Sequence, residues 1–285
     1  MFRPFRSVAE DGAHARTLTV DGVDLHWMEI GRGRPLVLLH GLGESHHTWS
    51  RIAPQLARDH RVLMPDLGGH GRSARPDASY SLDWHARVIG NWIDALGLDR
   101  IDLVGHSFGG GVAQWMLLEH APRIRKLGLV AAGGLGREVT LALRLAAFPH
   151  LVERLGQPFM MPGSFAAFGS MWNAYSPGEV WQLSRWNASR GSARAFARTV
   201  RDVIDLRGQS RGFFDRVHEI ATLPDIELFW GEDDRIIPLS HGVLAAAQID
   251  GATLHRFPAC GHHPHRERPN RFLALLRGFL GDPAS

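Results

Sequence analysis

The segment Gly105-His106-Ser107-Phe108-Gly109 constrains this chain more than any other. It follows a short apolar run, 101–104, and precedes a run of helix-forming residues, 112–118. This order predicts a strand, a sharp turn and a helix, with the Ser107 hydroxyl held at the turn where a base can reach it. Glycine is needed on both sides, because a side chain there would collide with the adjoining strand or helix. Gly-x-Ser-x-Gly is common by chance, so its meaning depends on partners elsewhere in the chain.

Short apolar runs alternate with helical patterns over most of the sequence. Two antiparallel strands are predicted within 15–30, and further strands at 36–39, 61–64, 101–104, 127–130, 226–230 and 253–257. The predicted helices cover 49–59, 81–96, 239–248 and 270–280. Such alternation is typical of βαβ units, so we expect an α/β fold with a mostly parallel sheet and an antiparallel edge.

The alternation stops between residues 135 and 213, where helical patterns occur without a convincing strand. We therefore predict a core made of 1–134 and 214–285, interrupted by a helical insertion, 135–213. The insertion holds more large apolar side chains than a small helical unit can bury alone, so some should line a cavity and others attach it to the core. Four of its residues are candidate substrate contacts: Trp172, Trp181, Arg185 and Trp186.

The insertion is also basic, with ten arginines against five acidic residues between 137 and 211. One interpretation is that Arg185, beside Trp186, recognises a carboxylate or phosphate on the substrate. The interpretation we favour is a solvated helix face, because charge runs usually lie on solvent.

Composition bounds the function class. The chain has 285 residues, 44% of them hydrophobic, and a formal net charge of +3. Its arginines are scattered and not interleaved with aromatic residues, so a nucleic-acid partner is not expected. Cys260 is the only cysteine, which excludes an intrachain disulfide. Neither a signal peptide nor a run of ~20 apolar residues is present, which predicts a cytoplasmic protein without a membrane span.

A serine nucleophile needs a base late in the chain. The segment 260–265 follows the last predicted strand and offers three histidines. His262 is the preferred base because it follows Gly261 closest to the strand end. His263 and His265 are expected to be solvated or packing residues.

The base needs an orienting acid, which should follow a strand between Ser107 and His262. Asp234, after the strand 226–230, is the preferred residue and Asp233 the alternative. The other place for such an acid, 131–134, contains no carboxylate.

The oxyanion needs two backbone N–H donors. Phe108 supplies one at the start of a helix, where the helix dipole also favours negative charge. Leu42, in the loop His40-Gly41-Leu42-Gly43, is the candidate for the second. His40 is expected to hold this loop by hydrogen bonds.

Together these segments resemble the α/β-hydrolase superfamily. The resemblance rests on five motifs in order, at 40–43, 66–73, 105–110, 230–238 and 261–269. It implies the α/β-hydrolase fold, a Ser107–His262–Asp234 triad, an insertion that caps the site, and structural roles for Asp66 and Glu267. We expect a small-molecule substrate, and neither a cofactor nor a metal. The oligomeric state, a homo-oligomer included, is left open.

Differences within the superfamily narrow the activity. Haloalkane dehalogenases and epoxide hydrolases of this fold use aspartate where this chain has Ser107. Carbon–carbon hydrolases of meta-cleavage pathways resemble it at 260–262, but usually have tryptophan in place of His263 and Gly-Pro in place of Glu44-Ser45.

The leading expectation is therefore a serine hydrolase, carboxylesterase-like, that cleaves an ester or related acyl compound through an acyl-enzyme. A carbon–carbon hydrolase of a diketone-like substrate is the second hypothesis. Haloperoxidase-like members of the superfamily have the same Ser-His-Asp triad. A non-catalytic ligand-binding protein on this scaffold is the third hypothesis.

Overall fold

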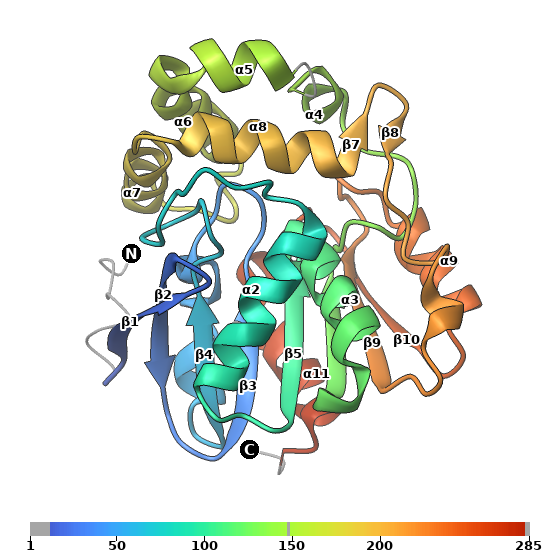
Figure 1. The fold of residues 1–285 in the computed structure, drawn as a ribbon. Coiled ribbons are helices and arrows are strands. Elements are labelled where there is room, and N and C mark those ends of the chain that lie inside the picture. Colours follow the sequence, from blue (N-terminus) through green and yellow to red (C-terminus); the bar gives the residue numbers. More distant parts are fainter. Residues whose placement is uncertain (1–11, 147–148, 283–285) are drawn as a thin grey trace.

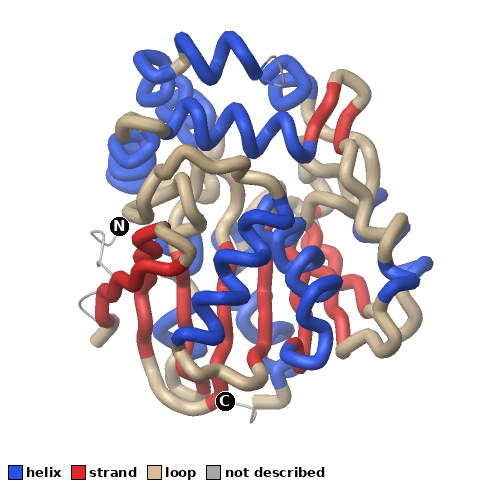
Figure 2. Tube along the Cα trace, in the orientation of Figure 1, coloured by secondary structure: helices blue, strands red, loops and turns tan. Residues whose placement is uncertain are grey.

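The computed structural model describes residues 12–146 and 149–282, and its centre is an eight-stranded sheet (Figures 1 and 2). The strand order is β1-β2-β4-β3-β5-β6-β9-β10. The strands β4, β3, β5, β6, β9 and β10 run parallel to one another, while β1 and β2 form the antiparallel edge. The predicted mostly parallel sheet is therefore confirmed. The strands are β1 His14–Val20, β2 Val23–Ile30, β3 Arg34–Leu39, β4 His60–Pro65, β5 Ile101–His106, β6 Ile124–Val130, β9 Asp225–Gly231 and β10 Thr253–Phe257.

Helices cover both faces of this sheet. The helices α2 (Leu82–Ala95), α3 (Phe108–His120) and α9 (Ser240–Gln248) pack on one face, and α1 (Ala53–Leu56) and α11 (Pro269–Leu280) on the other. In β3, Val37 and Leu39 join the first core while Leu36 and Leu38 join the second. A strand buried on both faces needs such a continuous apolar run.

The helix expected over 49–59 is shorter than predicted. A 3-10 helix covers His46–Trp49, and α1 spans only Ala53–Leu56. Pro54 lies in the first turn of α1, the one place where a helix tolerates a residue without an N–H, so the helix cannot continue back to Trp49. The helix at 81–96 is close to its prediction, and the Ser81 side chain caps it by accepting the Trp84 N–H.

Between β6 and β9 the chain forms a helical segment that lies beyond one end of the sheet (Figure 1). Its helices are α4 Leu141–Ala146, α5 Pro149–Leu155, α6 Met160–Gly169, α7 Pro177–Asn187 and α8 Ser192–Val203. All five lie within the predicted insertion, 135–213, whose boundaries stay a prediction. The expectation that this region lacks strands is wrong: β7 (Ile204–Asp205) pairs with β8 (Gly208–Gln209). Two-residue strands are too short to show alternation in the sequence.

The helical segment is attached by a buried arginine. Arg266, in the short helix α10 (Pro264–Glu267), is fully buried and forms an ion pair with Glu179 of α7. Its Nε donates to Ala174 O at 2.9 Å, and its Nη1 donates to His47 O and Thr48 O at 2.8 and 3.0 Å. A buried guanidinium is tolerated when its donors are satisfied in this way.

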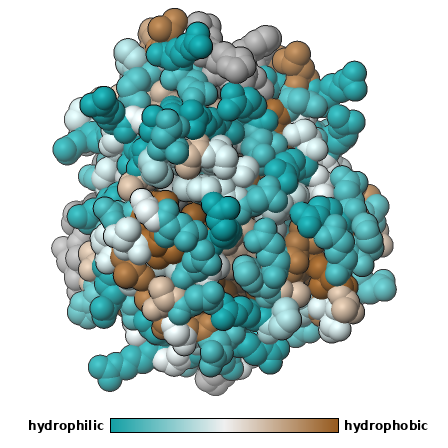
Figure 3. Space-filling model, viewed as in Figure 1, coloured by the Kyte–Doolittle hydropathy of each residue, from teal (hydrophilic) through white to brown (hydrophobic). Residues whose placement is uncertain are grey.

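The surface is mixed in character. On the face seen in Figure 3, hydrophilic side chains predominate and apolar atoms show in separate patches. Most of the exposed large apolar side chains among the described residues belong to the helical segment, which therefore does not bury all of its large apolar residues, as its composition predicts. The exposed ones there are Leu141, Leu155, Phe159, Phe165, Trp172, Trp181 and Leu206.

The passage from β5 into α3 takes place at one residue, Ser107, with φ 53° and ψ −117°. A Cβ at Gly105 would lie 2.4 Å from Gly109 O, and a Cβ at Gly109 would lie 2.4 Å from His40 O. Both distances are far below contact, so the two glycines let strand, turn and helix approach one another.

We expect Gly109→Ala to lower the free energy of unfolding by about 3 kcal/mol, because the added methyl meets backbone that cannot yield. Gly111→Ala is the matched control: its Cβ would lie 3.3 Å from Leu82 Cδ2, a mobile side-chain end. Alanine also favours the helix by about 1 kcal/mol, so this variant should remain as stable as wild type. Urea unfolding compares them, and equal midpoints would contradict the packing argument.

Candidate active site

A cavity of about 1270 Å³ lies between the sheet and the helical segment. It is larger than the pockets of about 300–1,000 Å³ that commonly hold small ligands. The core supplies Ser107 and His262 to its wall. The helical segment supplies mostly apolar side chains, among them Leu143, Phe159, Met160, Phe168, Met171 and Phe196.

Ser107 is held at the cavity wall by its own backbone. Its N–H donates to Val130 O at 2.9 Å, and its C=O accepts from the N–H groups of Gly110, Gly111 and Gly133. The left-handed backbone conformation is thereby fixed by four hydrogen bonds. No hydrogen bond joins Ser107 Oγ to His262 among the described residues, although both line the same cavity. Such contacts are often loose in ligand-free enzymes and tighten with substrate.

The structure brings His262 and Asp234 together. His262 Nδ1 donates to Asp234 Oδ2 at 2.8 Å, and both residues are buried. Asp234 Oδ1 accepts the N–H groups of Ile236 and Ile237 at 2.8 and 3.0 Å. With Nδ1 engaged, the Nε2 atom of His262 is the one able to accept a proton. The alternative acid, Asp233, is exposed.

The electrostatics of this pair follow from its geometry. Burial alone would raise the pKa of Asp234, but His262 and the two backbone N–H groups hold it below the ordinary value. Burial alone would lower the pKa of His262, yet the Asp234 carboxylate raises it above 6.5. The pair therefore favours a charged imidazolium, which a general base becomes when it takes a proton.

The loop expected to supply the second oxyanion donor also borders the cavity, with Leu42 in the lining. His40 braces this loop: Nδ1 donates to Gly41 O at 2.8 Å, and Nε2 accepts the Leu67 N–H at 2.9 Å. Burial lowers the pKa of His40, which suits this neutral form. Phe108 is the first residue of α3. The oxyanion roles of Leu42 and Phe108 stay predictions.

The four candidate contacts from the insertion do not line the cavity. Trp172 and Trp181 are 78% and 51% exposed, and Arg185 is exposed. Trp186 stacks on the ring of His47 at 5.3 Å. On α7 the buried positions are 179, 180, 183, 184 and 187, so 181 and 185 point outward. Helical periodicity in the sequence defines two faces but does not say which one another element covers.

His263 and His265 are packing residues and not solvated ones. They are 2% and 0% exposed. His265 Nε2 lies 2.8 Å from Thr48 Oγ1, and its ring packs on Trp49. His263 Nε2 donates to Glu44 Oε1 at 2.7 Å. Burial lowers the pKa of His263 to about 3, which keeps it neutral.

Sequence reasoning missed Glu44, which lines the cavity and is 3% exposed. In the sequence, Glu44 stood out only because carbon–carbon hydrolases usually have a glycine at this position. Its carboxylate also accepts from Gly41 N–H at 2.9 Å and from His106 Nδ1 at 3.1 Å. An acidic residue in a glycine-rich loop after a buried strand was the available signal.

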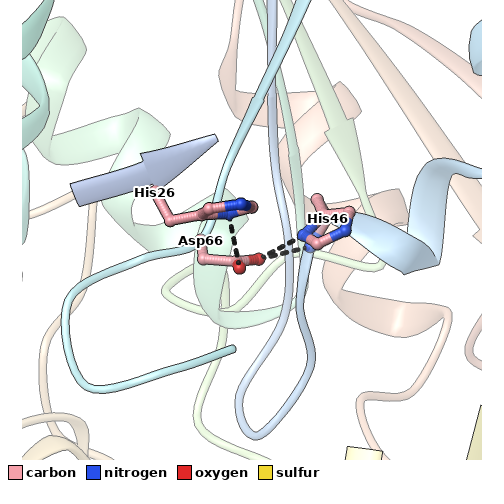
Figure 4. Close-up of side chains that lie close together, drawn as sticks. All are labelled: His26, His46 and Asp66. Carbon is pink, nitrogen blue, oxygen red and sulfur yellow. Dashed lines mark hydrogen bonds and ion pairs between the residues drawn. The ribbon is translucent and has the colours of Figure 1, made fainter. Parts of the chain in front are cut away.

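Two buried sets of side chains offer the donors that a metal ion takes, His26–His46–Asp66 (Figure 4) and Glu44–His106–His263. In the first set Asp66 is already well occupied. Its Oδ1 accepts both the N–H and the Nδ1–H of His46, its Oδ2 accepts the Arg72 N–H, and His26 Nδ1 lies 3.2 Å from Oδ2. This carboxylate ties three chain segments together, in agreement with the structural role that the motif implies.

Burial opposes the charge of Asp66, but His46 and His26 hold its pKa well below the ordinary value. A lowered folded-state pKa stabilises the protein above the unfolded value of about 3.9, and this contribution is lost as the pH falls below it. We expect Asp66→Asn to cost about 3–5 kcal/mol at pH 7, and the deficit to shrink by about 1 kcal/mol per pH unit below about 3.9.

Urea unfolding at pH 7 and pH 3 measures both effects. Asp99→Asn, at an exposed position, is the control and should stay within about 0.5 kcal/mol of wild type. A deficit for Asp66→Asn that does not depend on pH would contradict the assignment of a charged Asp66.

Residues 34–269 match the model of the family described as alpha/beta hydrolase fold. The chain is 31% identical to an uncharacterised protein of Mycobacterium tuberculosis, over 98% of this chain and 84% of the relative. It is 30% identical to the 2-hydroxymuconate semialdehyde hydrolase of Pseudomonas sp. (strain CF600), over 94% of each chain.

Among solved structures, the chain is similar to a meta-cleavage product hydrolase from Pseudomonas fluorescens IP01. The TM-score is 0.75 at 26% identity, and the match covers 93% of this chain and 97% of the other. The family match extends from β3 to the start of α11 and includes all five sequence motifs. The chain therefore belongs to the α/β-hydrolase fold family and is a hydrolase of that fold.

Proposed function

We propose that this protein is a serine hydrolase that cleaves a carboxylic ester through an acyl-enzyme at Ser107. The observation that carries the proposal is the buried hydrogen-bonded pair of Asp234 and His262. Asp234 engages Nδ1 of His262 and leaves Nε2 to act as the base, and His262 lines the same cavity as Ser107. A base, an orienting acid and a nucleophile at one cavity wall are the parts that acyl transfer requires.

In the proposed mechanism His262 Nε2 takes the proton of Ser107 Oγ as that oxygen attacks the ester carbonyl. The N–H groups of Phe108 and Leu42 hold the oxyanion. The tetrahedral intermediate collapses, and His262 returns the proton to the departing alcohol. Water, activated by the same imidazole, then hydrolyses the acyl-enzyme. Asp234 keeps its charge and stabilises the imidazolium throughout.

The cavity favours a neutral substrate with an apolar part. Its lining is largely aliphatic and aromatic, and the helical segment that supplies it acts as a cap in this proposal. Among the described lining residues Arg235 is the one arginine or lysine, and it is exposed. Glu44 lies in the same wall. A substrate carboxylate placed beside Glu44 would therefore meet an acidic group, while the arginine of the described lining lies at an exposed position.

A second candidate is hydrolysis of a carbon–carbon bond in a diketone-like substrate. It is favoured by the identity of 30% to the 2-hydroxymuconate semialdehyde hydrolase, and by a similar identity to the 2-hydroxy-6-oxo-2,4-heptadienoate hydrolase of Pseudomonas putida. A heptadienoate carries a carboxylate, and Arg235 at the exposed side of the cavity is the residue that would contact it.

The nucleophile is tested with a fluorophosphonate probe and p-nitrophenyl butyrate. Mass spectrometry should place the probe on Ser107, and Ser107→Ala should lose labelling and turnover. Asp234→Asn should lower kcat about 10⁴-fold, as in other triads, because the imidazole then adopts the wrong tautomer. The neighbouring Asp233→Asn is the matched control and should keep turnover. Full activity of Ser107→Ala would refute the mechanism.

The substrate class is tested by comparing p-nitrophenyl esters from acetate to octanoate with 2-hydroxy-6-oxo-2,4-heptadienoate. We expect kcat/KM to rise with acyl length, by up to about tenfold per two methylenes buried, and to exceed that for the dienoate. A higher kcat/KM for the dienoate, lost in Arg235→Gln, would support the carbon–carbon candidate instead.

A further inference from the structure

One buried carboxylate contacts three of the four loops that the proposed mechanism uses, all but the loop of Asp234. Glu44 Oε2 accepts the N–H of Gly41, in the loop assigned to the oxyanion, and Nδ1–H of His106, next to Ser107. Glu44 Oε1 accepts Nε2–H of His263, next to His262, and the hydroxyl of Tyr175 from the helical segment.

These contacts leave the carboxylate without spare capacity. Four donors occupy two oxygens that offer about four lone-pair positions. His106 is engaged on its other side as well, because its Nε2 lies 2.9 Å from His262 O. Both ring nitrogens of His106 thus face acceptors, so this ring links Glu44 to the backbone of His262 directly beside Ser107.

Two departures noted in the sequence prove to be one structural feature. Glu44 and His263 occupy positions where related carbon–carbon hydrolases usually have other residue types, and here they are hydrogen-bonded to each other. A tryptophan at 263 would present only one N–H donor, and a glycine at 44 would present no acceptor side chain. The hydrogen bond between these two loops therefore depends on both of the residues found in this chain.

We propose that Glu44 is a positioning residue. It holds three segments in one geometry: the loop at Gly41, the nucleophile turn at His106 and the base loop at His263. It also ties these segments to the helical segment through Tyr175. This inference rests on the proposed function. Glu44 does not touch the reacting atoms in it; it acts through the backbone of Gly41 and His262 and through the side chains that flank the triad.

The charge of Glu44 should affect the pH dependence of kcat/KM, which a purely structural role would leave unchanged. Asp234, Glu44 and Glu267 all raise the pKa of His262, while the rings of His106 and His263 pack against it. Because His262 must be neutral to act as a base, kcat/KM falls as the pH drops through this pKa. Removing the charge of Glu44 lowers the pKa of His262 and moves this acid limb to lower pH.

The test uses Glu44→Gln in the full chain. The glutamine oxygen still accepts from Gly41 and His106, and its NH₂ can donate to the Tyr175 oxygen and to His263 Nε2, so the shape is kept while the charge is lost. With p-nitrophenyl butyrate we expect kcat to fall about 10–100-fold with KM within twofold, and the acid limb to move to lower pH. A wild-type kcat and an unmoved acid limb would overturn the proposal.

A second variant keeps the charge and removes one contact. Tyr175→Phe should lower kcat about fivefold and leave the acid limb in place. Tyr80→Phe is the matched control, because Tyr80 is the other tyrosine, is buried, and donates its hydroxyl to Pro76 O at 2.6 Å. If Glu44→Gln does not fold, by circular dichroism, the two tyrosine variants decide: equal kcat values overturn the proposal.

Fluorophosphonate labelling separates this inference from the function on which it rests. If wild-type protein is not labelled at Ser107, the proposed function fails. If Ser107 is labelled but Glu44→Gln reacts at the wild-type rate across the pH range, the function stands and the role of Glu44 is refuted. Both the proposed function and the role of Glu44 are supported if Glu44→Gln is labelled more slowly, reaches the same final stoichiometry, and has the acid limb of its labelling rate at lower pH.

Discussion

The close approach of β5, Ser107 and α3 is the constraint on which the rest of the site depends. Gly105 lets β5 approach α3, and Gly109 lets α3 approach the end of β3, where any side chain would overlap backbone. Ser107 thereby lies at the carboxyl edge of the sheet. Because β5, β9 and β10 are parallel, the loops that follow them reach this same edge, and His262 and Asp234 meet there although 28 residues separate them.

Around this edge the protein buries several charged side chains and histidine rings. Charged groups removed from water are tolerated only when their hydrogen-bonding capacity is filled. Asp66 and Glu44 meet this condition through backbone N–H groups and histidine rings, while Arg266 meets it through three carbonyl groups and Glu179. Such saturated networks hold loops in one arrangement, which suits a site whose parts come from distant segments.

Much of the fold was predictable because local signals agree with the tertiary structure. Continuous apolar runs indicated the inner strands, and Ser81 marked the start of a helix. Errors arose where a local rule was overridden or too short to read. Pro54 shortened the helix expected over 49–59, and the two-residue strands β7 and β8 have no sequence pattern. In the helical segment, the composition indicated an apolar surface but not the direction in which Trp181 and Arg185 point.

The sequence by itself determined the fold family, the turn at Ser107 and the candidates for base and acid, because strand order, glycine positions and loop residues are local properties. Only the tertiary structure decided that His262 pairs with Asp234, that the cavity lining is largely apolar with an exposed arginine, and that Glu44 joins the loops around Ser107. The physical reason is distance along the chain: 219 residues separate Glu44 from His263, and no local pattern records a hydrogen bond between them.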